Sequence, residues 1–153
     1  MRRLINIISR FPKKNILVIG DIILDQYIQG SVSRISPEAP VPVVLEEKSF
    51  YTPGGAANVA HNLRALTAKV SLVGRIGNDP QGHIIKRQLN NKRINTEGIF
   101  VDRKLPTICK TRVIAQHQQV VRIDREKIQT AADKSVFSKI TNFVKRTIEA
   151  YDA

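Results

Sequence analysis

The chain has 153 residues, of which 42% are hydrophobic, and its 25 Lys and Arg against 13 Asp and Glu give a formal net charge of +12. This composition excludes a disordered tail, a collagen-like repeat and a low-complexity segment. No apolar run approaches the roughly 20 residues that cross a bilayer, so we expect no membrane-spanning segment. The single cysteine, Cys109, cannot form an internal disulfide, which favours a reducing compartment and a cytoplasmic protein.

The positive charge is concentrated in two segments. Proteins that bind nucleic acids specifically usually add exposed aromatic residues or a recognisable recognition module, whereas this chain is 5% aromatic and has no Trp. We therefore expect a solvated basic surface and no specific nucleic-acid partner, with anionic small molecules or nonspecific polyanion contacts as the alternatives. The two segments contain Arg2, Arg3, Arg10, Lys13 and Lys14, and Lys86, Arg87, Lys92 and Arg93.

The N-terminal segment has an amphipathic pattern, with four apolar residues on one helical face: Leu4, Ile7, Ile8 and Phe11. Such a pattern loosely resembles a transit peptide, but the stretch is short and poor in Ser. We expect a short amphipathic helix that packs on the domain. The absence of an apolar signal-peptide core argues against secretion.

The next segments alternate between strand and helix signals. Residues 15–20 form a continuous apolar run closed by Gly, which is typical of a buried strand in a parallel sheet. Residues 41–51 are rich in β-forming residues, but Pro42 restricts them to an edge or to a small separate sheet. A helix is predicted over 56–66, with Val59, Leu63 and Leu66 on its apolar side, and a short strand over 69–73.

The second half of the chain continues this alternation. A loop over 74–82 precedes a basic amphipathic helix over 83–91 and a short strand over 99–101. Residues 107–115 and 119–124 alternate apolar and polar side chains and flank a polar tripeptide, which predicts an antiparallel hairpin. A long helix is predicted over 130–151, with Thr130 as its N-cap and with apolar residues at helical spacing: Val136, Ile140, Phe143, Val144 and Ile148.

Strands and helices in alternation predict an α/β fold with a parallel sheet. The segments 31–51 and 107–124 do not fit this alternation, and we expect them to form a small sheet outside the main one. In an alternating fold the final helix leads into another buried strand, but the sequence ends at Ala153, before such a strand. We therefore expect an α/β domain truncated after about half of its length.

The strongest local motif is a glycine pair that opens the helix at 56–66, in the run Pro53-Gly54-Gly55-Ala56-Ala57-Asn58. Consecutive glycines permit positive φ angles and let backbone N–H groups approach a ligand closely. The N-terminus of the following helix favours partial negative charge, and Asn58 can both donate and accept hydrogen bonds with a sugar hydroxyl. The alternative is a glycine-rich turn without a ligand.

A second motif follows the first predicted strand, in the run Gly20-Asp21-Ile22-Ile23-Leu24-Asp25. Ligands of open α/β sheets bind at the carboxyl ends of the strands, and a carboxylate there can accept hydrogen bonds from two hydroxyls. The alternative is a surface Asp that caps the next turn. His61, His83 and His117 share no metal-ligand spacing with one another or with Cys109, so we expect no metal site.

These motifs, in this order, resemble the ribokinase-like sugar kinases, the PfkB carbohydrate kinase family. The family's first signature corresponds to the run from Gly54 to Ala60, followed by Thr67 and Gly77. Within the family, the run Arg34-Ile35-Ser36-Pro37-Glu38-Ala39-Pro40-Val41-Pro42-Val43 resembles bacterial heptose 7-phosphate kinases, the kinase half of the enzyme that makes ADP-heptose for lipopolysaccharide. Residues 110–113 and 118–124 continue the match, which covers about residues 14–153.

The resemblance implies a three-layer α/β/α domain with a small β lid formed by residues 31–51 and 107–124. It implies transfer of the γ-phosphoryl group of ATP, with Mg²⁺ in the complete enzyme, to a sugar hydroxyl. Asp25, Gly54, Gly55 and Asn58 would hold the sugar. We add Lys110 and Arg112 as candidates for the phosphate that the substrate already carries, because a pair of cations suits a dianion. A homodimer through the lid is also implied.

Two departures from the family pattern affect function. Thr67 stands where the family has Gly or Ser, and a positive φ there would strain a β-branched residue. The second signature, Asp-Thr-x-Gly-Ala-Gly-Asp, which supplies the catalytic base and the anion hole, is absent from the sequence. We expect residues 1–153 to be the N-terminal half of one kinase domain, with the base and the ATP-binding half beyond Ala153, and to be inactive alone. The alternatives are a noncatalytic sugar-phosphate-binding or dimerisation module and another PfkB-type sugar kinase.

Overall fold

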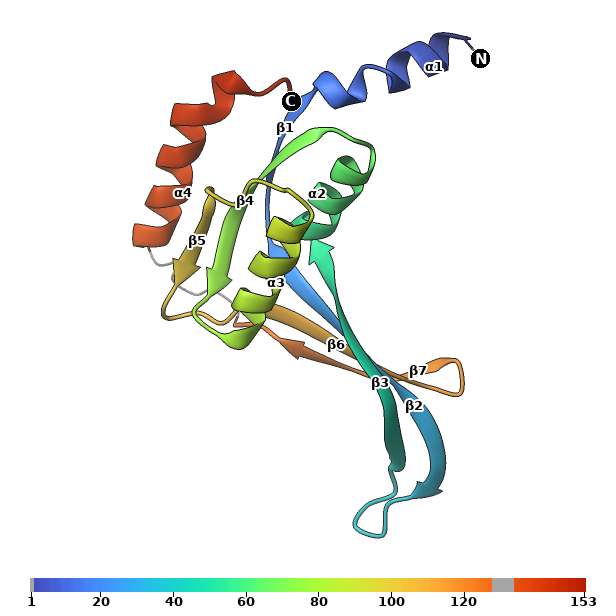
Figure 1. Ribbon diagram of the computed structural model, residues 1–153. Coiled ribbons are helices and arrows are strands. Elements are labelled where there is room, and N and C mark those ends of the chain that lie inside the picture. Colours follow the sequence, from blue (N-terminus) through green and yellow to red (C-terminus); the bar gives the residue numbers. More distant parts are fainter. Residues whose placement is uncertain (1, 128–133) are drawn as a thin grey trace.

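The computed structural model describes residues 2–127 and 134–153, which form two sheets and the helices around one of them (Figure 1). The first sheet has three parallel strands in the order β1-β4-β5, with Val18 of β1 beside Leu72 of β4. The predicted strands at 15–20, 69–73 and 99–101 are confirmed. β4 continues to Gly77 because its second half pairs with β5, a contact that local sequence does not encode. The bounds are β1 Asn15–Ile19, β4 Lys69–Gly77 and β5 Ile99–Asp102.

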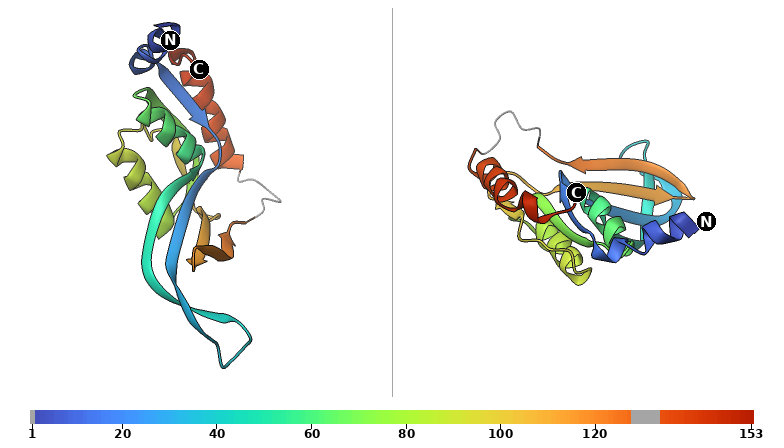
Figure 2. Two further views of the ribbon diagram at one scale, coloured as in Figure 1. Left: turned by 90° about the vertical axis from the view of Figure 1, so that its right-hand side faces the viewer. Right: turned by 90° about the horizontal axis from the view of Figure 1, so that it is seen from above.

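The second sheet has four strands in the order β3-β2-β6-β7 and projects away from the helices (Figures 1 and 2). Its two outer pairs are antiparallel, whereas β2 and β6 are parallel. Both predicted lid segments lie in this sheet, and the predicted hairpin at its far edge is confirmed. β3 is the other edge strand and begins at Pro42, as the proline requires. The bounds are β2 Ile22–Ile35, β3 Pro42–Gly55, β6 Ile108–Ala115 and β7 Gln118–Arg125.

The lid sheet is longer than the predicted segments because it begins inside the core, at Ile22. Leu24 of β2 is fully buried, and it lies in register with the buried Cys109 of β6. Further along, β2 is partly exposed and ends in exposed residues, where it leaves the core. The strands β2, β3 and β6 thus connect the core to the lid.

Helices cover both faces of the three-stranded sheet, which gives the expected three layers (Figure 1). α2 and α3 lie on one side and α4 on the other, where Phe143 of α4 meets Phe100 of β5 edge to face. The predicted cap Thr130 lies outside the described residues. No helix in the described part of the chain is long and apolar enough to cross a membrane. The helices are α1 Arg2–Ile8, α2 Ala56–Ala65, α3 Pro80–Asn91 and α4 Lys134–Thr147, with short 3₁₀ turns at Phe11–Lys13 and Ile148–Ala150.

The buried face of α2 is not the predicted one. Ala57 and Ala60 are completely buried, whereas Val59 and Leu66 are 50% and 52% exposed. Small side chains let the helix approach the sheet closely. The predicted apolar side was based on residue size, and only Leu63 of that side packs against the core.

The N-terminal helix also differs from the expectation. α1 forms, but its side chains Ile5, Ile7 and Ile8 are exposed, so the helix does not pack its apolar residues on the domain. Phe11, in the turn that follows, is partly buried and lines a small apolar cavity with Ile16.

The last described residues lie along the free edge of β1. The Asp152 backbone N–H donates to the Asn15 carbonyl, and the Leu17 N–H donates to the Ala153 carbonyl. Lys14 forms an ion pair of 2.6 Å with the Asp152 carboxylate and lowers its pKa. An extended segment therefore follows the final helix, but it is not the buried strand that an alternating fold predicts, because Asp152 and Ala153 are exposed.

Thr67 has a positive φ of 72°, the conformation that would strain a β-branched residue at this departure from the family pattern. It follows the C-terminus of α2, where glycine is the usual residue, and a left-handed backbone costs a β-branched residue about 1–2 kcal/mol. We therefore expect Thr67→Gly to raise the free energy of unfolding by about 1 kcal/mol, measured by urea denaturation. A lower stability of the variant would show that the Thr67 side chain contributes more than its backbone strain costs.

Candidate functional site

Asp25 lies within a strand rather than in the turn after β1. It is the fourth residue of β2, in register with Thr52 of β3 and Lys110 of β6. Strand alternation places these residues on one face of the lid sheet, opposite to the face that buries Leu24. The Asp25 side chain is 17% exposed and lines a cleft between the lid sheet and the helices α2 and α3.

The cleft has a volume of about 740 Å³, which is large enough for a phosphorylated sugar, and most of the residues that line it carry a polar group. β2 and β3 provide one wall, with Asp25, Tyr27 and Thr52, and α2 provides Asn58 in its first turn. The structure thus brings together Asp25 and Asn58, two residues that the sequence separates by a long hairpin. The rest of the lining comes from β3, from α2 and from α3 with the residue after it, namely Tyr51, Pro53, His61, Asn62, Gln88, Asn91 and Lys92.

The glycine pair closes β3 and leads into α2. Gly54 does not line the cleft, but a Cβ atom there would lie 2.5 Å from Oδ2 of Asp25. Any residue other than glycine would therefore displace the Asp25 carboxylate. Gly55 has a φ of 54°, the positive value that the motif predicts, and a Cβ atom there would lie 2.6 Å from the Asp21 carbonyl oxygen. The two glycines therefore shape the wall behind Asp25.

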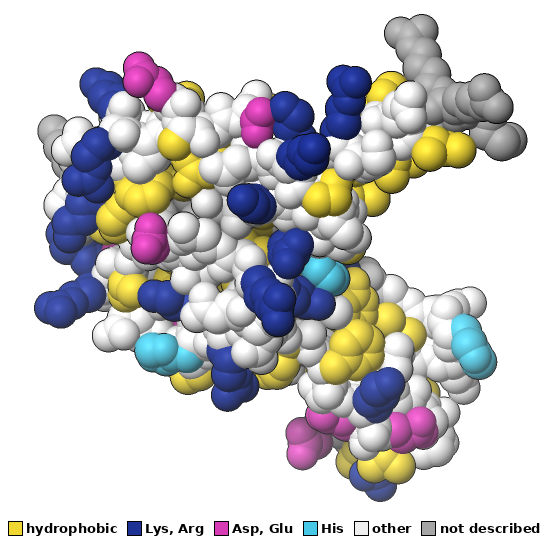
Figure 3. All heavy atoms as spheres, turned by 45° about the horizontal axis from the view of Figure 1, so that its top comes forward, with side chains coloured by type: hydrophobic (Ala, Val, Ile, Leu, Met, Phe, Trp, Pro, Cys, Tyr) yellow, Lys and Arg dark blue, Asp and Glu magenta, His cyan; other side chains and the backbone are white. Residues whose placement is uncertain are grey.

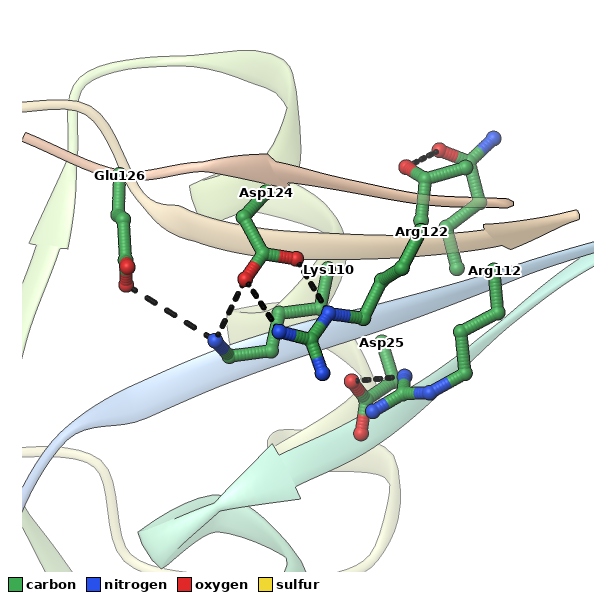
Figure 4. A network of polar contacts seen from close by, with 8 residues as sticks. Asp25, Lys110, Arg112, Arg122, Asp124 and Glu126 are labelled. Atoms are coloured by element: carbon green, nitrogen blue, oxygen red, sulfur yellow. Dashed lines mark hydrogen bonds and ion pairs between the residues drawn. The ribbon is translucent and has the colours of Figure 1, made fainter.

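Arg112 of β6 holds the Asp25 carboxylate (Figure 4). Its Nη1 atom donates a hydrogen bond of 2.6 Å to Oδ1 of Asp25, and this bond raises the pKa of Arg112. The guanidinium also lies 5.5 Å from the centre of the Tyr27 ring, which stacks on Phe50 of β3. The Asp25 carboxylate is therefore paired and fixed in orientation, with its second oxygen, Oδ2, free of this bond.

Lys110 lies on the same face of β6 but belongs to a different group of charges (Figure 4). Its Nζ atom lies 3.2 Å from Asp124 and 3.9 Å from Glu126, and Arg122 donates two further hydrogen bonds to Asp124. Burial opposes the ionisation of Asp124, but the hydrogen bonds from Lys110 and Arg122 lower its pKa overall. Neither Lys110 nor Arg112 is among the residues that line the cleft.

Sequence reasoning missed the residues at the far end of the cleft. His61 was considered only as a metal ligand, and in the described part of the chain no group of three His, Cys, Asp or Glu side chains is placed to hold a metal ion. Lys92 was counted with the solvated basic surface, and Lys and Arg side chains are indeed spread over the face shown in Figure 3. The available signal was the spacing of Asn58 and His61, which puts both on one side of α2.

Comparison with known proteins gives a consistent result. The chain matches the pfkB family carbohydrate kinases over residues 13–149. It is 45% identical over 145 residues to the bifunctional protein HldE of Desulfatibacillum aliphaticivorans, a match that covers 95% of this chain and 29% of the relative. It is 53% identical over 122 residues to the protein of the same name from Gluconobacter oxydans, covering 79% of this chain and 26% of the relative. The chain thus spans less than a third of the length of these relatives.

Solved structures share the fold. A carbohydrate kinase from Agrobacterium tumefaciens superposes with a TM-score of 0.67 at 20% identity, over 91% of this chain and 43% of that one. Arabidopsis thaliana ribokinase, complexed with ribose and ATP, superposes with a TM-score of 0.60 at 19% identity, over 72% of this chain and 35% of that one. These matches confirm the ribokinase-like α/β/α fold with its β lid. The chain belongs to the pfkB family of carbohydrate kinases.

Proposed function

We propose that this chain supplies the sugar-binding part of an ATP-dependent sugar kinase whose substrate is D-glycero-D-manno-heptose 7-phosphate, in the synthesis of ADP-heptose. The observation that supports this most is the Asp25 carboxylate, which Arg112 and Gly54 hold against a polar cleft of a suitable size. The family match supports a sugar as the ligand. The run from Arg34 to Val43, which resembles the heptose 7-phosphate kinases, supports this particular sugar.

In this proposal the sugar hydroxyls contact the residues predicted from the sequence. Asp25 accepts hydrogen bonds through Oδ2, and Asn58 donates and accepts at the start of α2. Gly54 and Gly55 contribute by their lack of side chains. The binding of the phosphate by Lys110 and Arg112 stays a prediction. Each of them is paired with a carboxylate, which a phosphate would have to displace.

ATP and Mg²⁺ belong to the proposal for the complete enzyme. Phosphoryl transfer depends on positioning and on electrostatic stabilisation of the transferred group. The motif expected to supply the base and the anion hole does not occur in these 153 residues. We therefore assign sugar binding, and not turnover, to this chain.

Asp25→Asn is expected to weaken the binding of heptose 7-phosphate by about 30- to 100-fold, because charge-assisted hydrogen bonds contribute about 2–3 kcal/mol. Isothermal titration calorimetry of the chain measures this effect. Glu149→Gln is the matched control, since it makes the same acid-to-amide change at an exposed position of the last 3₁₀ turn. Equal affinities of Asp25→Asn and the control would remove Asp25 from the site.

We also propose that the chain forms a homodimer through the lid, because the lid exposes large apolar side chains and two strand edges. Leu45→Asp, at a position 66% exposed, is expected to give a monomer in light scattering at about 100 µM, where the unchanged chain is a dimer. Val101→Asp introduces the same charge on β5, outside the lid, and is expected to leave the dimer intact. A strictly monomeric unchanged chain would rule out this dimer. The exposed lid residues are Ile35, Val41, Leu45, Val120, Val121 and Ile123.

A further inference from the structure

The far end of the cleft carries polar groups for which the proposed function has no role. His61 lies three residues after Asn58 on α2, about 4.5 Å further along the helix axis. Lys92 follows the last residue of α3 and lines the same cleft, as does Gln88 one turn earlier. A ligand that contacts Asp25 and Asn58 with one end can therefore reach these three residues with the other.

The charged residues in and beside the lid wall of the cleft are paired with one another. Asp25 is paired with Arg112 at 2.6 Å, and Lys110 is paired with Asp124 at 3.2 Å. Among the described residues, none of the ion pairs involves Lys92. Asp25 is the only acidic residue that lines the cleft, so the end with Lys92 has a positive potential that no neighbouring carboxylate in the described lining cancels.

Gln88 adds an acceptor without a partner. Its Nε2 atom donates a hydrogen bond of 3.1 Å to the Tyr51 carbonyl, which fixes the orientation of the amide. Its Oε1 atom is buried and has no hydrogen-bond partner among the described residues. Because buried polar atoms are nearly always paired, this oxygen is left to a donor outside the described residues, from ordered water or from a ligand. A polyhydroxylated ligand supplies such a donor.

We propose that His61 and Lys92 form a phosphate subsite at this end of the cleft, with Gln88 accepting a hydrogen bond from a hydroxyl between the phosphate and the sugar ring. The identity of the sugar rests on the proposed function, whereas the phosphate subsite rests on the residues themselves. Both side chains donate charge-assisted hydrogen bonds to a dianion. Lys110 and Arg112 do not line this cleft, so the subsite binds phosphate without breaking their ion pairs.

Inorganic phosphate tests the subsite without any sugar. Burial and the charge of Lys92 lower the pKa of His61 in the free protein. A phosphate dianion beside the imidazole stabilises its protonated form, so NMR titration in about 50 mM phosphate is expected to raise this pKa by about 1 relative to chloride of equal ionic strength. Lys92→Met is expected to abolish the difference, and Lys110→Met to preserve it. An unchanged pKa in the wild-type chain would overturn the proposal.

A second experiment compares heptose 7-phosphate with unphosphorylated heptose by calorimetry. Lys92→Met is expected to weaken the binding of the phosphorylated sugar by about 10- to 100-fold. It is expected to weaken the binding of the unphosphorylated sugar by less than about twofold. Equal losses for both sugars, or a loss in Lys110→Met and none in Lys92→Met, would overturn the subsite. If His61 responds to phosphate but neither sugar binds, the subsite stands and the proposed function fails. If the sugar phosphate binds through Asp25 and is indifferent to Lys92, the subsite fails and the proposed function stands.

Discussion

Asp79→Ala is expected to lower the free energy of unfolding by about 3 kcal/mol, measured by urea denaturation at pH 7. The Asp79 carboxylate caps α3 by accepting from the Gly82 N–H at 2.9 Å, and a lost cap costs about 1 kcal/mol. It also accepts from the N–H and the hydroxyl of Thr107, at 2.9 and 2.6 Å. Thr107 is completely buried, so its unpaired N–H adds about 1–3 kcal/mol. A loss below about 1 kcal/mol would contradict this role.

The same carboxylate makes stability depend on pH. Burial opposes its ionisation, but hydrogen bonds from Thr107 and Gly82, together with the nearby Arg125, lower the pKa of Asp79 overall. Because the pKa is lower in the folded than in the unfolded chain, this stabilisation is complete above about pH 4 and is lost as the pH falls through the folded value. Asp79→Asn lacks the titrating group, so its free energy of unfolding is expected to fall less between pH 6 and pH 3. Parallel curves for the two proteins would assign the acid sensitivity to other groups.

Gly54→Ala is expected to weaken sugar binding by about 100-fold while changing stability much less. The added methyl group would lie 2.5 Å from Oδ2 and 2.9 Å from Cγ of Asp25, so the carboxylate must turn away. Arg112 holds the opposite oxygen at 2.6 Å, so turning away also breaks that bond. The loss of both contacts is comparable to the loss of the Asp25 charge itself.

Calorimetry with heptose 7-phosphate measures this effect, and thermal denaturation separates it from unfolding. Gly20→Ala is the control, because its methyl group would meet only the Ala56 Cβ, at 3.2 Å. If the Gly54→Ala chain binds heptose 7-phosphate as tightly as the control, Asp25 does not bind the sugar from the position it has in this structure.

Local signals predicted much of the fold. The apolar run at β1, the alternating hairpin of β6 and β7, and the edge position of β3, which contains Pro42, all depend on side chains close in the sequence. The confirmed turn at Gly55 belongs to the same group, because a positive φ is a property of one residue. The resemblance to a family supplied the rest of the architecture, including the lid.

Contacts between distant residues were outside the reach of sequence patterns. Asp25 and Arg112 are 87 residues apart, and Asp79 and Thr107 are 28 apart, so neither pair has a local signature. Asp25 was placed at the end of β1 because the start of β2, with three apolar residues before a carboxylate, does not alternate. The cleft residues His61 and Lys92 come from different elements, α2 and the residue after α3, and line one cleft only in the folded chain.

A phosphorylated sugar is expected to bind between the lid and α2, on Asp25 and Asn58. NMR chemical-shift mapping with heptose 7-phosphate tests it directly, because each backbone amide reports its own surroundings. The account predicts the largest shifts at Gly54, Gly55 and Asn58, with saturation at one ligand per chain. A separate cleft lies between the β5–β6 loop and β7 and is lined by Arg103 and Lys127. The expected binding site would be contradicted by largest shifts around that cleft, or by no shifts at millimolar ligand.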